Sequence, residues 1–271
     1  MKKFENCLFV SDMDATLLTS EHEISDKNRN AIEYFIENGG KFTVASGRML
    51  DAIRVYLDRM KINAPAIAHN GAKIYDFLAD RLLYEKSIED SRKPIVKKVY
   101  KDMPELGLEI YSNEVIYVYR RCEETKRFLT KNYDVVYDMP DYVWKQPWSK
   151  LLLIGDNKEI LDKYEPIYRN SYDNGCCVRS GELYLDIIAN GVSKGNAAKL
   201  VCNMTNCTKL FAIGDSENDF ELMKNADISF AVENAVPKIK SAASYQAPHH
   251  NNDAIAYAIE KLDKLRGNIN E

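Results

Sequence analysis

Short apolar runs alternate with helical patterns at both ends of this chain, and this alternation restricts the fold more than any other feature of the sequence. The first third reads strand, helix, strand, helix, strand over residues 7–10, 24–39, 42–46, 49–59 and 65–71. The first of these helical patterns has apolar side chains along one face and ends on two glycines, as helices often do. The order predicts a doubly wound α/β sheet with parallel strands, a Rossmann-like core.

The alternation returns near the C-terminus. Predicted helices at 193–202, 216–226 and 253–265 are interleaved with predicted strands at 209–214, 228–232 and 244–247. Two blocks of one open sheet therefore flank the middle of the chain.

The middle of the chain has a different pattern. Residues 106–120 and 176–188 each contain two alternating apolar and polar segments around a turn, which predicts antiparallel hairpins. We therefore expect a discontinuous core domain at residues 1–84 and 188–271, with an inserted α+β cap domain at residues 85–187.

Composition excludes several classes of protein. With 37 basic and 41 acidic side chains, the net charge is −4, and no basic excess favours nucleic acid. No apolar stretch approaches the roughly 18 residues of a membrane span, and we expect the N-terminal segment to be part of the mature protein. The cysteines lack the spacing of a zinc site or a disulfide framework, which favours a cytoplasmic location.

Polar residues follow the predicted core strands at the edge where open parallel sheets bind ligands. They are Asp12 and Asp14 after the first strand, Ser46, Gly47 and Arg48 after the second, Asn70 and Gly71 after the third, and Asp215, Asn218 and Asp219 after the fourth. Lys194 begins a predicted helix just before that fourth strand.

This set of side chains favours a phosphate site with magnesium. Converging carboxylates without histidine or cysteine suit Mg²⁺, and a lysine at a helix N-terminus suits a phosphoryl group. One carboxylate of a close pair can attack phosphorus, while a second carboxyl donates a proton to the leaving oxygen and later takes one from water.

Four motifs occur in a fixed order along the chain. They are Asp12-Met13-Asp14-Ala15-Thr16, Ala45-Ser46-Gly47-Arg48, Gly191-Val192-Ser193-Lys194-Gly195 and Gly214-Asp215-Ser216-Glu217-Asn218-Asp219. Together they resemble the motifs of the haloacid dehalogenase superfamily of phosphatases, and within it the Cof-type (subfamily IIB) sugar phosphatases with an α+β cap after the third core strand. The resemblance covers essentially the whole chain.

The resemblance implies a role for each matching residue. Asp12 would be the nucleophile and a Mg²⁺ ligand, Asp14 the general acid/base whose backbone carbonyl also meets the metal, and Asp215 the third protein ligand. The transferring phosphoryl group would be bound by Ser46, Gly47 and Lys194 with the help of Asn218, and Asp219 would orient Lys194 or metal-bound water.

Two usual glycines of the family are replaced here, by Ala15 and by Ala254. We expect Ala15 to adopt the ordinary helical conformation, because a positive φ would cost an alanine about 1 kcal/mol or more. We also expect His249 and His250 to lie in a solvated loop. Trp144 and Trp148 could stack on a sugar ring or pack inside the cap.

The favoured function is a Mg²⁺-dependent phosphatase that acts on a small phosphorylated metabolite, with sugar phosphates as the first class to test. The alternatives are a phosphomutase and a non-catalytic phosphate-ligand sensor, although a sensor does not need both Asp12 and Asp14. The expected partners are small molecules rather than nucleic acid or membranes. Both a monomer and a homodimer remain open.

Overall fold

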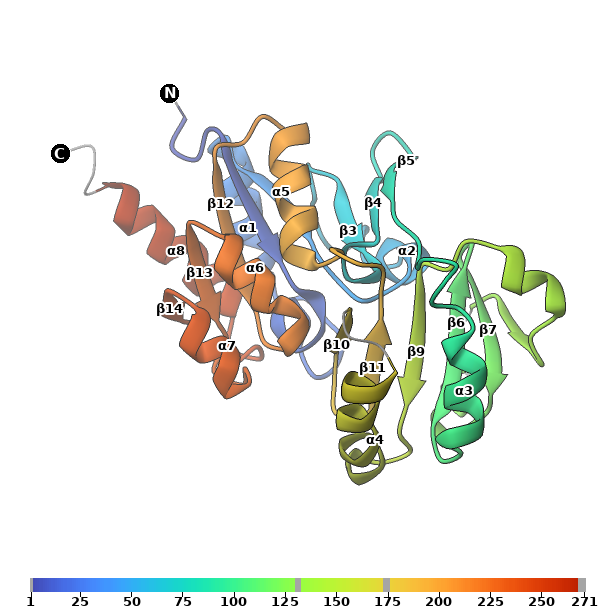
Figure 1. Ribbon diagram of the computed structural model, residues 1–271. Coiled ribbons are helices and arrows are strands. Elements are labelled where there is room, and N and C mark those ends of the chain that lie inside the picture. Colours follow the sequence, from blue (N-terminus) through green and yellow to red (C-terminus); the bar gives the residue numbers. More distant parts are fainter. Residues whose placement is uncertain (1, 130–132, 173–175, 268–271) are drawn as a thin grey trace. The chain divides into compact units, whose positions relative to one another are not determined.

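The chain forms two compact units in a computed structural model that describes residues 2–129, 133–172 and 176–267 (Figure 1). Unit 1 comprises Met1–Tyr84 and Ser193–Glu271, and unit 2 comprises Glu85–Val192. Residues 188–192 thus group with unit 2, whereas the sequence placed them in the core. As a division into domains, the sequence-based boundaries stay a prediction.

Unit 1 is built on a parallel sheet with the strand order β14-β13-β12-β1-β2. The strands are β1 Cys7–Ser11, β2 Lys41–Val44, β12 Lys209–Gly214, β13 Ile228–Ala231 and β14 Tyr245–Gln246. All five residues of β1, which lies between β12 and β2, are buried, as expected for a parallel strand covered on both faces.

Helices cover both faces of this sheet. They are α1 Asp26–Glu37, α2 Leu50–Arg54, α5 Lys194–Met204, α6 Phe220–Asn225, α7 Pro237–Ala242 and α8 Ala254–Gly267. Figure 1 shows α5 and α6 on one side of the strands and α1 and α8, which pack together, on the other. The predicted doubly wound α/β core is confirmed.

The second predicted helix is shorter than expected. The sequence favoured a helix over residues 49–59, but α2 ends at Arg54. Beyond it the amides of Tyr56, Leu57 and Arg59 each bond to the carbonyl three residues back. The segment therefore continues as tight turns, which the apolar spacing alone does not distinguish from an α-helix.

The third predicted strand has a second role that the sequence did not reveal. Strand β3 (Ala66–Ala68) continues the parallel order through one bridge, between Ala45 and Ile67. It also heads a small sheet with the order β3-β4-β5, which contains β4 Lys73–Asp76 and β5 Arg81–Glu85.

Unit 2 is a six-stranded sheet with the order β10-β11-β9-β6-β7-β8. Its strands are β6 Gly107–Ser112, β7 Val115–Arg120, β8 Val135–Tyr137, β9 Lys150–Ile154, β10 Cys177–Arg179 and β11 Tyr184–Ile187. All described pairings are antiparallel except β7 with β8. Both predicted hairpins are present, and Asn113 and Glu114 turn the first with positive φ angles of 51° and 59°.

The two faces of the unit 2 sheet differ in polarity. Helices α3 (Ile95–Asp102) and α4 (Lys158–Ser171) pack on the apolar face. Trp148 is fully buried in this core and donates from Nε1 to the carbonyl of Val143 at 2.8 Å, so it packs inside the unit.

In the described part of the chain, no helix is both long and apolar enough to cross a membrane.

Candidate active site

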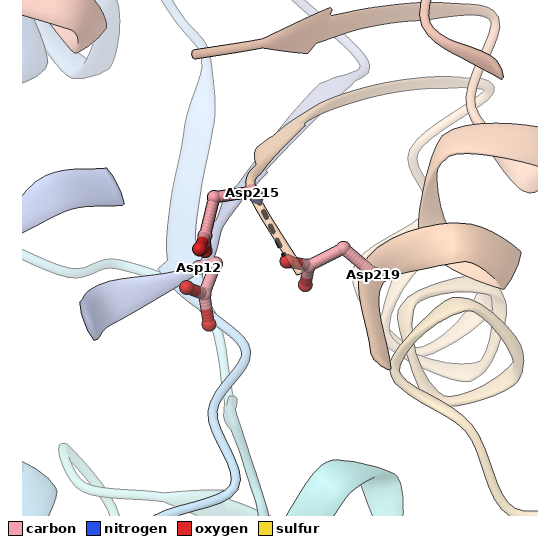
Figure 2. Close-up of side chains that lie close together, drawn as sticks. All are labelled: Asp12, Asp215 and Asp219. Carbon is pink, nitrogen blue, oxygen red and sulfur yellow. Dashed lines mark hydrogen bonds between the residues drawn. The ribbon is translucent and has the colours of Figure 1, made fainter. Parts of the chain in front are cut away.

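The site lies where β1 and β12 end, because these adjacent parallel strands deliver their following residues to the same edge. The two strands pair in register up to Ser11 and Ile213, and the amide of Asp12 donates to the carbonyl of Ile213 at 3.0 Å. Asp12 and Asp215, which are far apart in the sequence, therefore lie side by side (Figure 2).

Lys194 connects two of the site's carboxylates. Its ammonium donates to Asp12 Oδ1 at 2.5 Å and to Asp219 Oδ1 at 2.7 Å, and the side chain is only 1% exposed. Although burial opposes its charge, the two aspartates raise the pKa of Lys194 above its usual value. Lys194 is therefore a fixed positive charge at the first turn of α5.

A glycine makes this placement of α5 possible. A Cβ on Gly195 would lie 2.2 Å from the carbonyl oxygen of Glu221, so only glycine lets α5 approach α6 this closely. Ser193 caps the helix by accepting a hydrogen bond from the amide of Asn196.

The carboxylate of Asp219 is occupied by donors from its own surroundings. Oδ1 accepts from Lys194, and Oδ2 accepts from the amides of Asp215 and Ser216 at 3.0 and 3.1 Å. Figure 2 shows the bond from the Asp215 amide. Asp219 thus contacts both Lys194 and the loop after β12, and its expected role of orienting Lys194 or metal-bound water stays a prediction.

Asp215 accepts from two hydroxyl groups. Thr16 Oγ1 donates to Oδ1 at 3.1 Å and Ser216 Oγ donates to Oδ2 at 3.0 Å. Burial and the charge of Asp219 raise the pKa of Asp215 to about 6. Both hydroxyls can rotate, so the carboxylate oxygens can also serve a cation.

The charges of the cluster fit a bound cation. Asp12, Asp215 and Asp219 each offer an oxygen within 4.8 Å of the others, and Lys194 alone does not balance three carboxylates. Burial, followed by the charges of Asp219 and Asp215, raises the pKa of Asp12 well above its usual range despite Lys194. Oxygen donors with excess negative charge suit a hard divalent ion such as Mg²⁺.

The side chain of Asp14 points to a different partner from that of Asp12. Arg48 donates two hydrogen bonds to the Asp14 carboxylate, from Nε to Oδ2 at 2.8 Å and from Nη2 to Oδ1 at 2.6 Å. Although burial opposes it, this pairing lowers the pKa of Asp14. The sequence noted Arg48 only as a turn neighbour of Ser46, and no local pattern reveals a partner 34 residues away.

The residues expected to bind phosphate converge as well. Asn70 Oδ1 accepts a hydrogen bond from Asn218 Nδ2 at 3.0 Å, and the backbone amide of Asn70 donates to the carbonyl of Ser46. Ser46 is buried, and a Cβ on Gly47 would lie 3.1 Å from Asn70 Oδ1. Among the described residues, the buried Nδ2 of Asn70 has no hydrogen-bond partner. The side-chain Nδ2 of Asn70 is therefore a further candidate donor at this site, and the sequence analysis had assigned it no binding role.

The expectation for Ala15 is wrong. Its φ is 53° and its ψ is 21°, which is the left-handed region where glycine is favoured. The chain turns sharply here, between Asp14 with its bond to Arg48 and Thr16 with its bond to Asp215. Tertiary contacts on both sides therefore impose a conformation that local preference opposes.

The expectation for the histidine pair is also wrong in part. His250 is only 8% exposed, and its Nδ1 lies 2.8 Å from the carbonyl oxygen of Leu18. A carbonyl can only accept, so Nδ1 carries the proton in this contact. His249 is half-buried and its ring packs beside that of His250.

This chain belongs to the haloacid dehalogenase-like hydrolase family, whose model matches residues 9–259. The family predicted from the four motifs is therefore confirmed, and the protein is an enzyme of the hydrolase class.

Curated relatives match over nearly their full length. The Buchnera aphidicola protein BU028/BU029, provisionally named a phosphatase, is 27% identical and is matched over 94% of this chain and 96% of its own. The 5-amino-6-(5-phospho-D-ribitylamino)uracil phosphatase YcsE of Bacillus subtilis is 25% identical over 93% of this chain and 94% of its own.

Solved structures share the fold. TM0651 of Thermotoga maritima is 29% identical with a TM-score of 0.76, covering 94% of this chain and 96% of that one. A subclass IIB sugar phosphatase, BT4131, has a TM-score of 0.79 at 19% identity, covering 94% and 98%. The latter likeness shows the same fold, an α/β core with a separate, mostly antiparallel sheet.

Proposed function

We propose that this protein is a Mg²⁺-dependent phosphatase that hydrolyses small phosphorylated metabolites through a phosphorylated Asp12. The observation that carries the proposal is the buried contact of Lys194 with Asp12 and Asp219 beside Asp215. This arrangement places a carboxylate, a fixed cation and candidate metal ligands at one point of the sheet edge. The phosphatase names of the curated relatives agree with it.

In the first half-reaction, an oxygen of Asp12 attacks phosphorus and forms a P–O bond while the bond to the leaving oxygen breaks. Asp14 must be protonated for this step although Arg48 lowers its pKa, so its contact with Arg48 must change when the substrate binds. Asp14 then gives its proton to that oxygen, and the alcohol leaves neutral. Lys194 lies next to the attacking carboxylate and balances charge on the transferring group. When bound, Mg²⁺ would be held by Asp12, Asp215 and the backbone carbonyl of Asp14 and would supply the remaining positive charge.

In the second half-reaction, water attacks the phosphorylated carboxyl at phosphorus, and the bond between phosphorus and Asp12 breaks. Asp14 accepts the proton that water loses, and inorganic phosphate leaves. The ionised state in which Arg48 holds Asp14 is the state needed to accept this proton.

The transferring phosphoryl group would be bound by donors around Asp12. We assign this role to Ser46, the backbone at Gly47, Lys194 and Asn218, and we add the buried Nδ2 of Asn70 because it lacks a partner among the described residues. These groups recognise the phosphoryl oxygens and leave the rest of the substrate undefined.

We place sugar phosphates and related polyol phosphates first among the substrates, because the relative YcsE is named for a phosphoribitylamino compound. A cytoplasmic location and a monomeric or homodimeric state belong to the same proposal. Release of free phosphate from a hexose phosphate supports hydrolysis, whereas isomer exchange without release would indicate a phosphomutase.

The test is a phosphate-release screen with Mg²⁺ over sugar phosphates, nucleotides, pyridoxal phosphate and flavin mononucleotide. We expect turnover of at least one sugar phosphate, and its loss in Asp12→Asn or with a chelator. Asp58→Asn, at an exposed aspartate outside the site, is the matched control and should retain activity. If no ester were hydrolysed, the hypothesis of a non-catalytic phosphate-ligand sensor would replace this proposal.

A further inference from the structure

We propose that Asn234, His250 and Asn251 form a polar brace that positions the Asp12 loop, defined as residues 12–20. None of these three residues belongs to the four motifs that identified the site. Each contacts a different point of the loop from more than 200 residues away, with sequence separations of 219, 232 and 231. We assign them a positioning role, because they act through the loop backbone and the Ser20 hydroxyl.

The first contact holds the strained residue of the loop. Asn234 Nδ2 donates to the carbonyl oxygen of Ala15 at 2.8 Å. Ala15 has a φ of 53°, a left-handed conformation that alanine disfavours. The hydrogen bond fixes the peptide that follows Ala15 and so favours the strained conformation over its relaxed alternative.

The second contact connects Asn234 to the far end of the turn. The amide of His250 donates to Asn234 Oδ1 at 3.0 Å, and Nδ1 of the same residue donates to the carbonyl of Leu18 at 2.8 Å. Because His250 is almost fully buried, these bonds are shielded from water. Asn234 and His250, which are hydrogen-bonded to each other, thus hold Ala15 and Leu18.

The third contact closes the brace. Asn251 accepts from the amide of Ser20 at 2.9 Å through Oδ1 and donates to the Ser20 hydroxyl at 3.0 Å through Nδ2. Adjacent residues, His250 and Asn251, therefore hold Leu18 and Ser20. Ala15, which replaces the usual glycine of the family, and His250 of the histidine pair therefore belong to the same hydrogen-bonded brace.

The position of this loop matters to the site because it carries three of its side chains. Asp12 contacts Lys194, Asp14 contacts Arg48 and Thr16 contacts Asp215. If Ala15 relaxed to a negative φ, the backbone on either side of it would rotate. The contacts of Asp14 with Arg48 and of Thr16 with Asp215 could then not both be kept. A displacement of about 1 Å in such a group can reduce turnover a hundredfold.

The test compares Asn234→Ala with Asn252→Ala, a control at an exposed neighbour of the brace. Hydrogen–deuterium exchange of the peptide covering residues 13–20 is the first readout, since the Leu18 amide bonds to the Met13 carbonyl at 2.9 Å. We expect faster exchange in this peptide for Asn234→Ala only, with exchange in β12 unchanged.

The second readout is kinetic and rests on the proposed phosphatase function. For Asn234→Ala we expect kcat to fall about tenfold with KM changed less than about twofold, because the groups that bind phosphate stay in place. In an Ala15→Gly background the same change should lower kcat less than about threefold, since glycine adopts the left-handed conformation unaided.

The outcomes separate the brace from the phosphatase proposal. Unchanged exchange over residues 13–20 in Asn234→Ala would overturn the brace, whatever the protein's activity. An equal loss of kcat with Ala15 and with glycine at this position would also contradict it, because Asn234 would then act independently of the strain. Failure of the unmodified protein to hydrolyse any ester would contradict the phosphatase proposal alone, and exchange would still decide on the brace.

Discussion

At the scale of single residues, two aspartates that lie close in sequence have different electrostatic surroundings. Asp12 is buried against Lys194 and two further carboxylates, so its pKa is raised. Asp14 is half-exposed and paired with Arg48, so its pKa is lowered. The difference arises from partners on other segments of unit 1. The proposed roles need the opposite states, an ionised Asp12 and a protonated Asp14, so binding of the cation and the substrate must change both.

Ala15→Gly is expected to stabilise the protein by about 0.5–1 kcal/mol. Relief of the left-handed strain exceeds the extra entropy that glycine gives the unfolded chain. Urea unfolding followed by circular dichroism measures the change. The control Ala31→Gly, within α1, should lower stability by about 1 kcal/mol. A destabilising effect of Ala15→Gly would contradict the assigned backbone conformation.

Cys202 is expected to resist alkylation in the native protein. Burial, together with nearby Cys207, raises the pKa of its thiol to about 12, so almost no thiolate exists at pH 8. Mass spectrometry after iodoacetamide treatment should find Cys202 unmodified under native conditions and modified in denaturant. Equal labelling in both conditions would show that the thiol is accessible and ionisable.

At the scale of elements, the sequence predicted what depends on short-range pattern. Buried strands, their polar ends and the hairpin at residues 112–114 follow from periodicity and turn chemistry. The left-handed Ala15, the burial of His250 and the partner of Asp14 depend on contacts across the fold, and these cannot be deduced from neighbouring residues. The end of α2 at Arg54 was missed because tight turns and a helix share similar apolar spacing.

The polar face of the unit 2 sheet contains a buried ion pair between neighbouring strands. Lys150 on β9 donates to Asp186 on β11 at 2.7 Å, and the two side chains are 7% and 1% exposed. Removing one partner leaves the other charge buried. We therefore expect Lys150→Met to lower the free energy of unfolding by about 3–5 kcal/mol.

Two variants check this prediction by chemical denaturation. Lys158→Met breaks an exposed pair with Asp162 and should cost less than about 1 kcal/mol. The double change Lys150→Met with Asp186→Leu should cost less than Lys150→Met alone, because no unpaired charge remains. Equal costs for Lys150→Met and Lys158→Met would contradict the argument.

At the scale of the whole molecule, the excess of carboxylates in unit 1 should couple metal binding to stability. Mg²⁺ that binds only the folded state raises the melting temperature as its concentration rises. Differential scanning fluorimetry should show this for the unmodified protein. Asp215→Asn, which removes one charged oxygen ligand, should reduce the shift strongly, and Asp58→Asn should not.

The absence of a Mg²⁺-dependent shift in the unmodified protein would contradict the assignment of Asp12 and Asp215 as metal ligands. An undiminished shift in Asp215→Asn would place the ion elsewhere. Either result would leave the fold and family assignment intact, because those rest on the strand order and on the match over residues 9–259.

The central claim is that Asp12 itself becomes phosphorylated. The most direct measurement is rapid acid quenching during turnover of a hydrolysed ester, followed by peptide mass spectrometry. The account predicts one added phosphoryl group on Asp12, absent from Asp12→Asn, which should also be inactive. Phosphorylation of a different residue, or wild-type turnover by Asp12→Asn, would contradict it.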